Sequence, residues 1–454
     1  MLRASAIVEK AGVPSTSLVC DGFIGQARAV SSGFGVPDIP VARVVGHVDS
    51  QSAGELADNL RAVTVDEVVR QLTTAPALGS DADTADTAVV ARGSFDEVNR
   101  LFLERGWSDG LPIVPPTEER VAAFLAETPD PPDREIGVLL PSGRLATTRN
   151  VAVNGVMAGC DPAVMPVLVA IAEAMADPHY GVQHSGDTTG GEALVILSGP
   201  AVRELGFNHA GAALRDGYKA NTSVGRFVRL MLRNVAGSRP EGADKSTFGN
   251  TWRVVLAEDE AAVRSIGWPT FGAERGFADG ESAVTMARYT GGGVVGSIYG
   301  RTAAEIVPYL ADGLVRQASW ELAFTVGFAP GTYCPLLVLS PLVAATLSRD
   351  GVGKTDLQAV LREHARLPAR KLEAYIGAWS NLVPGRRTLA QLVEAGQADP
   401  IYAESDDPDR LVPIAVRPED FMVVVSGDPR RSNAYAFGHN GMHGFPTSKR
   451  VRMA

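Results

Sequence analysis

The sequence has few cysteines, few histidines and no long apolar run. Its 454 residues contain only three cysteines, Cys20, Cys160 and Cys334, which lie far apart and are odd in number. This pattern excludes a disulfide framework and fits a reducing compartment, so we expect a cytoplasmic protein.

No apolar stretch reaches the ~18 to 20 residues that a membrane-spanning helix needs, and we expect no membrane partner. The closest stretch is 165–176, where Pro166 and Glu173 favour a buried helix instead. The N-terminus shows no basic segment followed by an apolar one, which argues against a secretory signal. A net charge of −10 gives the surface no general attraction for nucleic acid.

The length and the helix-start signals predict an α/β protein with more than one domain. Ser94 and Glu97 form a capping box before an amphipathic segment, and Thr64 and Glu67 form a similar pattern. Residues 75–93, which follow the first predicted helix, are small, acidic and aperiodic, as in a linker. We therefore predict a small, incomplete α/β N-terminal domain and a larger multi-strand α/β domain, with the bounds 1–74, 75–93 (linker) and 94–454. A division of the large domain into two sub-domains near 300–330 is an alternative.

Short apolar runs alternate with helical segments in the large domain. Residues 193–198, 336–340 and 421–427 are typical of buried strands, and strands of this kind alternating with helices indicate an α/β sheet. Asp161 and Pro162 predict the start of the apolar helix that follows them.

Two glycine-rich segments have to be weighed as binding motifs. Residues 351–355 read Gly-Val-Gly-Lys-Thr, but a phosphate-binding loop needs glycine where Ser348 stands, so we predict a turn. Residues 186–191 precede a strand, whereas a dinucleotide fingerprint follows one, so they are predicted to form a loop beside His179 and His184.

The histidines favour proton transfer over metal binding. His439 and His443 are three residues apart among glycines, which indicates a loop and not a metal-binding helix face. His179 and His184 have no carboxylate or cysteine at a zinc spacing, and we predict no metal. The candidate catalytic histidines, all placed in loops, are His184, His209 and His439.

A polar stretch at 218–226 is predicted to open a helix capped by Thr222 or Ser223. Its N-terminus, with nearby cations, is a candidate anion pocket, although an ordinary capped helix is an open alternative. The candidate substrate-binding residues are Lys219, Asn221, Thr222 and Arg226. The polar loop 244–250 could face the same cleft.

Cys160 is the candidate reactive thiol and the fourth candidate catalytic residue. It directly precedes the helix start at Asp161, where the helix dipole is expected to lower a thiol pKa. Cys20 and Cys334 adjoin predicted strands and are expected to lie in the core.

Four segments near the N-terminus, 7–16, 21–23, 35–37 and 45–49, resemble the UGSC family and, more distantly, the selenoprotein subunit of the glycine reductase B component. The UGSC family is named for a selenocysteine-Gly-Ser-Cys motif in which Cys often takes the first place. The segment that follows this motif in the family is matched here by Glu9, Gly12, Val13 and Pro14.

The resemblance implies a thiol- or selenol-dependent oxidoreductase or reductive lyase that acts on a small organic substrate. It implies no bound cofactor, and an external thiol or dithiol as reductant. The reactive motif itself would precede Met1, so we expect either a longer natural chain or a small subunit that supplies the Sec/Cys motif. The alternative is a non-redox enzyme or a ligand-binding subunit of a hetero-oligomer, built on the large α/β domain alone.

Overall fold

A computed structural model describes most of the chain, and it confirms the predicted α/β class. The described residues are 2, 5, 8–9, 11–25, 27, 31, 39–73, 89–240, 242–325, 329–379, 388–441 and 444–453. His443 and most of the predicted linker lie outside them, so the division into domains stays a prediction. Within the described ranges, no helix is long and apolar enough to cross a bilayer.

The N-terminal segment contains a two-stranded parallel sheet and a long helical stretch. The strands are β1 (Ser17–Cys20) and β2 (Val41–Val44). The helical stretch is made of α3 (Ala53–Asn59), one π turn (Leu60–Thr64) and α4 (Val65–Leu72).

The capping box expected at Thr64 and Glu67 is wrong, because Thr64 lies inside this continuous helical stretch. The Thr64 hydroxyl donates to the Arg43 carbonyl at 2.7 Å, and the Glu67 carboxylate accepts from the Arg43 N–H at 2.6 Å. Both side chains fasten the helix to β2 and do not start it.

The large region begins with helices whose starts follow the sequence signals. The capping box of Ser94 and Glu97 is present, and Asp161 accepts from the Ala163 N–H ahead of the buried helix α8 (Met165–Ala176), as predicted. The other elements before the main sheet are α5 (Phe95–Glu104), α6 (Glu118–Leu125), β3 (Glu135–Leu139), β4 (Arg144–Thr147) and α7 (Thr148–Ala158).

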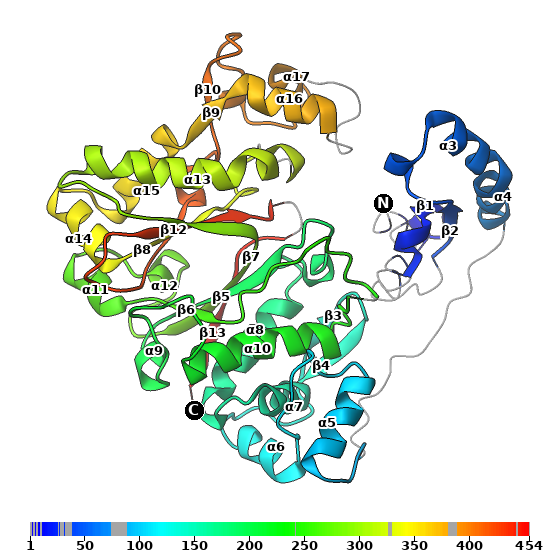
Figure 1. The fold of residues 1–454 in the computed structure, drawn as a ribbon, viewed down its shortest axis with the longest axis horizontal. Helices are drawn as coiled ribbons and strands as arrows, with labels where there is room; N and C mark the ends of the chain where they lie inside the picture. The colour runs from blue at the N-terminus through cyan, green and yellow to red at the C-terminus, as the bar shows by residue number, and fades with distance from the viewer. Residues whose placement is uncertain are drawn as a thin grey trace.

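A seven-stranded mixed sheet organises the rest of the large region (Figure 1). Its order is β11-β8-β12-β7-β5-β6, and β13 also pairs with the long central strand β7. The strands are β5 (Glu192–Ser198), β6 (Val255–Ala257), β7 (Ser282–Val295), β8 (Leu336–Leu339), β11 (Met422–Val425), β12 (Ala434–His439) and β13 (Thr447–Val451). The three strands expected from apolar runs are thus confirmed as β5, β8 and β11.

The two edge strands of this sheet meet at one corner. The Asp259 N–H, just after β6, donates to the Val425 carbonyl of β11 at 2.8 Å. The Ser426 hydroxyl, just after β11, donates to the Ala257 carbonyl of β6 at 2.8 Å. The sheet is therefore curled, and the curl satisfies backbone groups that an open edge would expose.

Strand side chains alternate between an inner core and two outer cores, as the period of two requires. Leu194 and Leu336 belong to the inner core, while their neighbours Val195 and Leu337 belong to the two larger cores. The larger cores are covered by helices, with α8 packing on β7 and β13, and α13 (Ala303–Thr325) packing on β12 and β7.

Helices from the C-terminal part complete the second outer core. These helices are α11 (Glu260–Ser265), α13 (Ala303–Thr325), α14 (Pro341–Arg349), α15 (Lys354–His364), α16 (Ala369–Trp379) and α17 (Leu389–Glu394). Helix α10 (Lys219–Asn234) packs in the other outer core, together with α8. Short pieces complete the described chain: α9 (Ala201–Glu204), α12 (Phe271–Glu274), β9 (Arg366–Pro368) and β10 (Leu411–Pro413). Strands from before and after 300–330 pair in one sheet, so no sheet boundary falls there.

The Gly-Val-Gly-Lys-Thr segment ends in a buried ion cluster. Lys354 opens α15 with its side chain fully buried, 2.6 Å from Glu274 and 3.9 Å from Glu258. One ammonium faces two carboxylates, and burial raises the pKa of Glu258 to about 7 despite the opposing charge of Lys354. The lysine fastens α15 to β6 and α12, which leaves it no freedom to serve as a phosphate ligand.

We predict that Glu258 makes the protein less stable as the pH rises. A raised pKa favours the protonated carboxyl in the folded state, so this stabilisation is complete below pH 4.5 and is lost as the pH rises through about 7. The loss should be on the order of 3 kcal/mol. In urea unfolding between pH 4.5 and 8, Glu258→Gln should gain stability relative to the wild type. Glu363→Gln, an exposed change on α15, should follow the wild type. Parallel curves for all three proteins would refute the assignment.

Candidate functional site

Two loops pair side by side and enclose a cavity. Within loops 186–191 and 244–251, the Lys245 N–H donates to the Gly186 carbonyl at 2.7 Å, and the Thr247 N–H donates to the Thr188 carbonyl at 3.2 Å. The close approach requires glycine: a Cβ on Gly186 would lie 2.6 Å from the Asp244 Cα, and the φ of Gly186 is +89°.

Asp187 organises the first loop and joins it to the end of β12. One carboxylate oxygen accepts from the Thr189 hydroxyl and from the N–H groups of Gly190 and Gly191. The other oxygen accepts from the Asn440 side-chain amide at 2.5 Å. Segments more than 200 residues apart are thereby fixed at the base of the cavity.

The cavity has a volume of about 510 Å³, within the size range of small-molecule sites. Its lining is glycine-rich and polar, with one acidic–basic pair. The lining residues are Gly186, Gly190, Gly191, Glu192, Arg229, Pro240, Asp244, Ser246, Phe248, Gly249, Asn250 and Thr251.

The pair is formed by Glu192, at the start of β5, and Arg229, on α10. Their side chains approach to 2.7 Å, with 6 % of the Glu192 side chain and 27 % of the Arg229 side chain exposed. Burial raises the pKa of Glu192, the charge and hydrogen bond of Arg229 oppose the shift, and Asp244 adds to it. A carboxyl group with a raised pKa beside a cavity suits general acid–base chemistry.

At the rim of the cavity stands Phe248, whose surface is 98 % exposed. An exposed phenylalanine gains nothing from the folded core. Its ring is accessible to a molecule in the cavity.

The predicted site residues lie elsewhere. None of the four predicted catalytic and four predicted substrate-binding residues is among those that line the cavity. Loop 244–250, which was expected to face the same cleft as residues 218–226, pairs with loop 186–191.

His439 is a structural residue, contrary to the prediction of proton transfer. It is fully buried, its Nδ1 accepts from the Cys334 N–H at 3.0 Å, and burial lowers its pKa to about 3. The imidazole is therefore neutral and fixed within the inner core. His184 ends a short 3-10 helix (Val182–His184) just before the first loop.

His209 has the geometry of a proton-transfer residue, but it is not among the residues that line the cavity. Its Nδ1 lies 3.4 Å from the Asp259 carboxylate, and 36 % of its side chain is exposed. The Asn221 side chain accepts from the Asn208 N–H and donates to the carbonyls of Asn208 and Val255. Asn221 is thus a buried strut that positions the His209 segment, and not a substrate ligand.

The structure corrects the expectation for Cys160. The residue is only 8 % exposed, and burial raises the pKa of its thiol to about 12, although the Ser223 hydroxyl and the charges of Lys219 and Arg226 lower it somewhat. Desolvation outweighs the helix start, which here is a single 3-10 turn (Pro162–Val164). Cys334 is likewise buried with a pKa of about 12, whereas Cys20 is partly exposed.

The helix that carries the predicted anion pocket begins earlier than expected. α10 starts at Lys219 with Tyr218 as its N-cap, and no side chain caps it. The Thr222 hydroxyl instead accepts from the Gly217 N–H at 3.1 Å, and Lys219 pairs with Asp161 at 3.3 Å.

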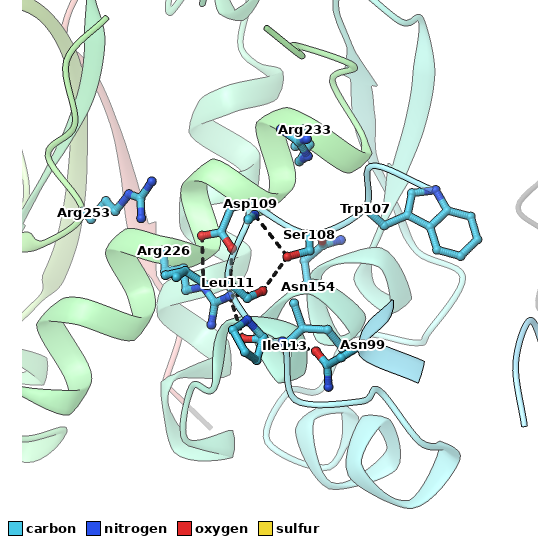
Figure 2. A network of polar contacts seen from close by, with 12 residues as sticks. Asn99, Trp107, Ser108, Asp109, Leu111, Ile113, Asn154, Arg226, Arg233 and Arg253 are labelled. Atoms are coloured by element: carbon cyan, nitrogen blue, oxygen red, sulfur yellow. Dashed lines mark hydrogen bonds and ion pairs between the residues drawn. The ribbon is translucent and has the colours of Figure 1, made fainter. Parts of the chain in front are cut away.

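Arg226 is a strut for the Gly106–Pro116 loop, as Figure 2 shows. It forms two hydrogen bonds with the Asp109 carboxylate, at 2.8 and 3.1 Å, and a third with the Pro112 carbonyl at 2.9 Å. Burial opposes ionisation of Asp109, but the hydrogen bonds and charge of Arg226 outweigh it, and the pKa stays below its usual value.

Glu192 and Arg229 are the residues that sequence reasoning missed. Glu192 stands directly before an apolar strand run, and Arg229 lies one helical turn beyond Arg226. The only available signal was an acidic residue at the start of a buried strand, next to a glycine-rich loop. In the described ranges, no group of three His, Cys, Asp or Glu side chains could hold a metal ion.

The fold and the site define an α/β protein with a polar cavity between two loops. Residues 1–74 match the model of the UGSC family, which is the family that the N-terminal segments resemble. Among curated proteins, none matches this sequence.

We predict that Asp109→Asn releases the 106–116 loop. The substitution leaves the largely buried Arg226 without a charged partner and should cost about 2 to 4 kcal/mol of unfolding free energy. Hydrogen exchange should show faster opening of this loop. Asp161→Asn is the matched control, because its pair with Lys219 is exposed and should contribute less than about 1 kcal/mol. Equal effects of the two substitutions would contradict the structural role that we assign to the Arg226–Asp109 pair.

We also predict that alkylation distinguishes the three thiols. In the native protein, Cys20 should react with iodoacetamide, while Cys160 and Cys334 should react roughly 100-fold more slowly, since they are buried and hold little thiolate. Peptide mass spectrometry measures each rate, and unfolding in urea should make the three rates similar. Rapid labelling of native Cys160 would restore it as a reactive thiol.

Proposed function

We propose that this chain is an enzyme that binds a small organic molecule in the cavity between loops 186–191 and 244–251 and transforms it by acid–base chemistry. The observation that carries the proposal is the pair of buried Glu192 and partly exposed Arg229, which lines a cavity of about 510 Å³. This proposal corresponds to the non-redox alternative predicted from the sequence, in which the large α/β region acts alone.

In this proposal Glu192 exchanges a proton with the substrate and Arg229 orients it. Three features support the assignment: Glu192 is buried, its pKa is raised, and it contacts a guanidinium that has further N–H donors. Because Glu192 is only 5 % exposed, water screens its interaction with a bound substrate only weakly.

The test begins with a thermal-shift screen of small acids, amides, esters and amines, followed by NMR detection of turnover for every stabilising compound. Glu192→Gln should lower kcat by about 10² to 10⁴-fold while the ligand still binds within about 10-fold of the wild-type affinity. Glu118→Gln, an exposed change on α6, should leave kcat unchanged. Wild-type turnover by Glu192→Gln would refute the acid–base role.

A second candidate function is the thiol- or selenol-dependent oxidoreductase or reductive lyase. The observation that favours it is the UGSC match of residues 1–74. In this candidate the same cavity holds the substrate, a separate small subunit supplies the Sec/Cys pair, and an external dithiol is the reductant. It requires substrate consumption that depends on both dithiol and the added subunit. Consumption by the chain alone, unaffected by Cys→Ser changes at all three cysteines, would exclude it.

A further inference from the structure

We infer that the ligand of this cavity is a small aromatic or apolar molecule with a single carboxylate group, which pairs with Arg229. The inference rests on the proposed function and names its substrate class. The argument comes from the charges that line the cavity and from the exposed ring at its rim.

Arg229 is the one cation among the residues that line the cavity. Its guanidinium carries five N–H donors in a planar fork that matches a carboxylate. In the part of the chain that the structure describes, its only ionic contact is the 2.7 Å approach of one terminal nitrogen to Glu192. Since 27 % of its side chain is exposed, the remaining donors can reach a ligand oxygen.

The acidic groups of the lining limit the charge of the ligand to one. An Asp244 oxygen accepts from the Ser246 N–H and hydroxyl at 3.0 and 2.7 Å, and these hydrogen bonds hold the carboxylate in place. Glu192 adds a second carboxyl group. A doubly charged phosphate would be repelled by both, whereas a monoanion meets one guanidinium and a carboxyl that can take up a proton.

The apolar part of the ligand is inferred from the exposed side chain of Phe248 at the rim of the cavity. Phe248 is 98 % exposed, and Asn250 and Thr251 lie next to it in the lining. Aromatic rings stack on aromatic ligands at offset or edge-to-face geometry, so an aryl group best uses this side chain. Benzoate and phenylacetate combine such a body with a single carboxylate.

Ligand binding should take up a proton. A ligand carboxylate bound to Arg229 weakens the interaction between Arg229 and ionised Glu192. The pKa of Glu192 therefore rises further on binding, and Glu192 takes up a proton. The charged and titratable groups that face Glu192 are Arg229, Asp244 and Tyr180, and Arg288 stacks on the Tyr180 ring. Asp244 acts in the same direction, because its charge disfavours the ionised form of Glu192.

The test compares matched compounds by calorimetry on the full chain: benzoate and phenylacetate, their amides, and benzylamine. The acids should bind at least 10-fold more tightly than the amides, more tightly at pH 6 than at pH 8, and with proton uptake measured in buffers of different ionisation enthalpy. Arg229→Gln should lose at least 10-fold in affinity for the acids and none for the amides. Arg229→Lys should keep part of the affinity, and Arg203→Gln, an exposed change on α9, should keep all of it.

The outcomes separate this inference from the proposed function. If benzylamine or the amides bind and the acids do not, the carboxylate class is wrong while the cavity remains a binding site. If Glu192→Gln abolishes turnover of an amine, the acid–base proposal stands without this inference. If neither these compounds nor those of the wider screen bind, both proposals fail.

Discussion

The meeting of the two edge strands at one corner of the sheet is the contact on which the large region depends. Asp259 and Ser426 exchange hydrogen bonds with the opposite strand ends there, and the sheet curls around its inner core. A flat sheet would leave both edges unpaired and the inner faces of β5 and β8 uncovered. Asp259 also caps α11 and faces His209, so its side chain fixes two further segments at this corner.

At the cavity, too, a single carboxylate makes several hydrogen bonds that hold distant segments together. Asp187 accepts from two backbone N–H groups and from Asn440, which joins a loop before β5 to the end of β12. The glycines between them are required by distance: a Cβ on Gly191 would lie 2.2 Å from the Asn440 side chain. The loop is therefore rigid, and Glu192 emerges from a fixed backbone at the cavity wall.

Local signals in the sequence predicted local structure well. The Ser94 capping box, the Asp161–Pro162 start and the bounds of α8 depend on neighbouring residues, and each is present. The class of fold also followed from the alternation of apolar runs. The site did not, because burial is a property of the tertiary structure: it lowers the pKa of His439 and raises that of Cys160, opposite to the roles that their local sequences suggested.

Helix α10 shows why cations cannot be assigned from their spacing alone. Its sequence presents Lys219, Arg226 and Arg229 on one helix, and any of them could hold an anion. Two receive carboxylates from distant parts of the chain, Asp161 for Lys219 and Asp109 for Arg226, and the second pair is bidentate and largely buried. Arg229 also receives a carboxylate, but from Glu192, whose burial makes its own charge unfavourable. The pKa of Asp109 lies below its usual value, whereas the pKa of Glu192 is raised by burial, so Glu192 takes up a proton more readily than Asp109. The pair of Arg229 and Glu192 can release the guanidinium to an incoming anion without leaving an unpaired buried charge, which the strut formed by Arg226 and Asp109 cannot do.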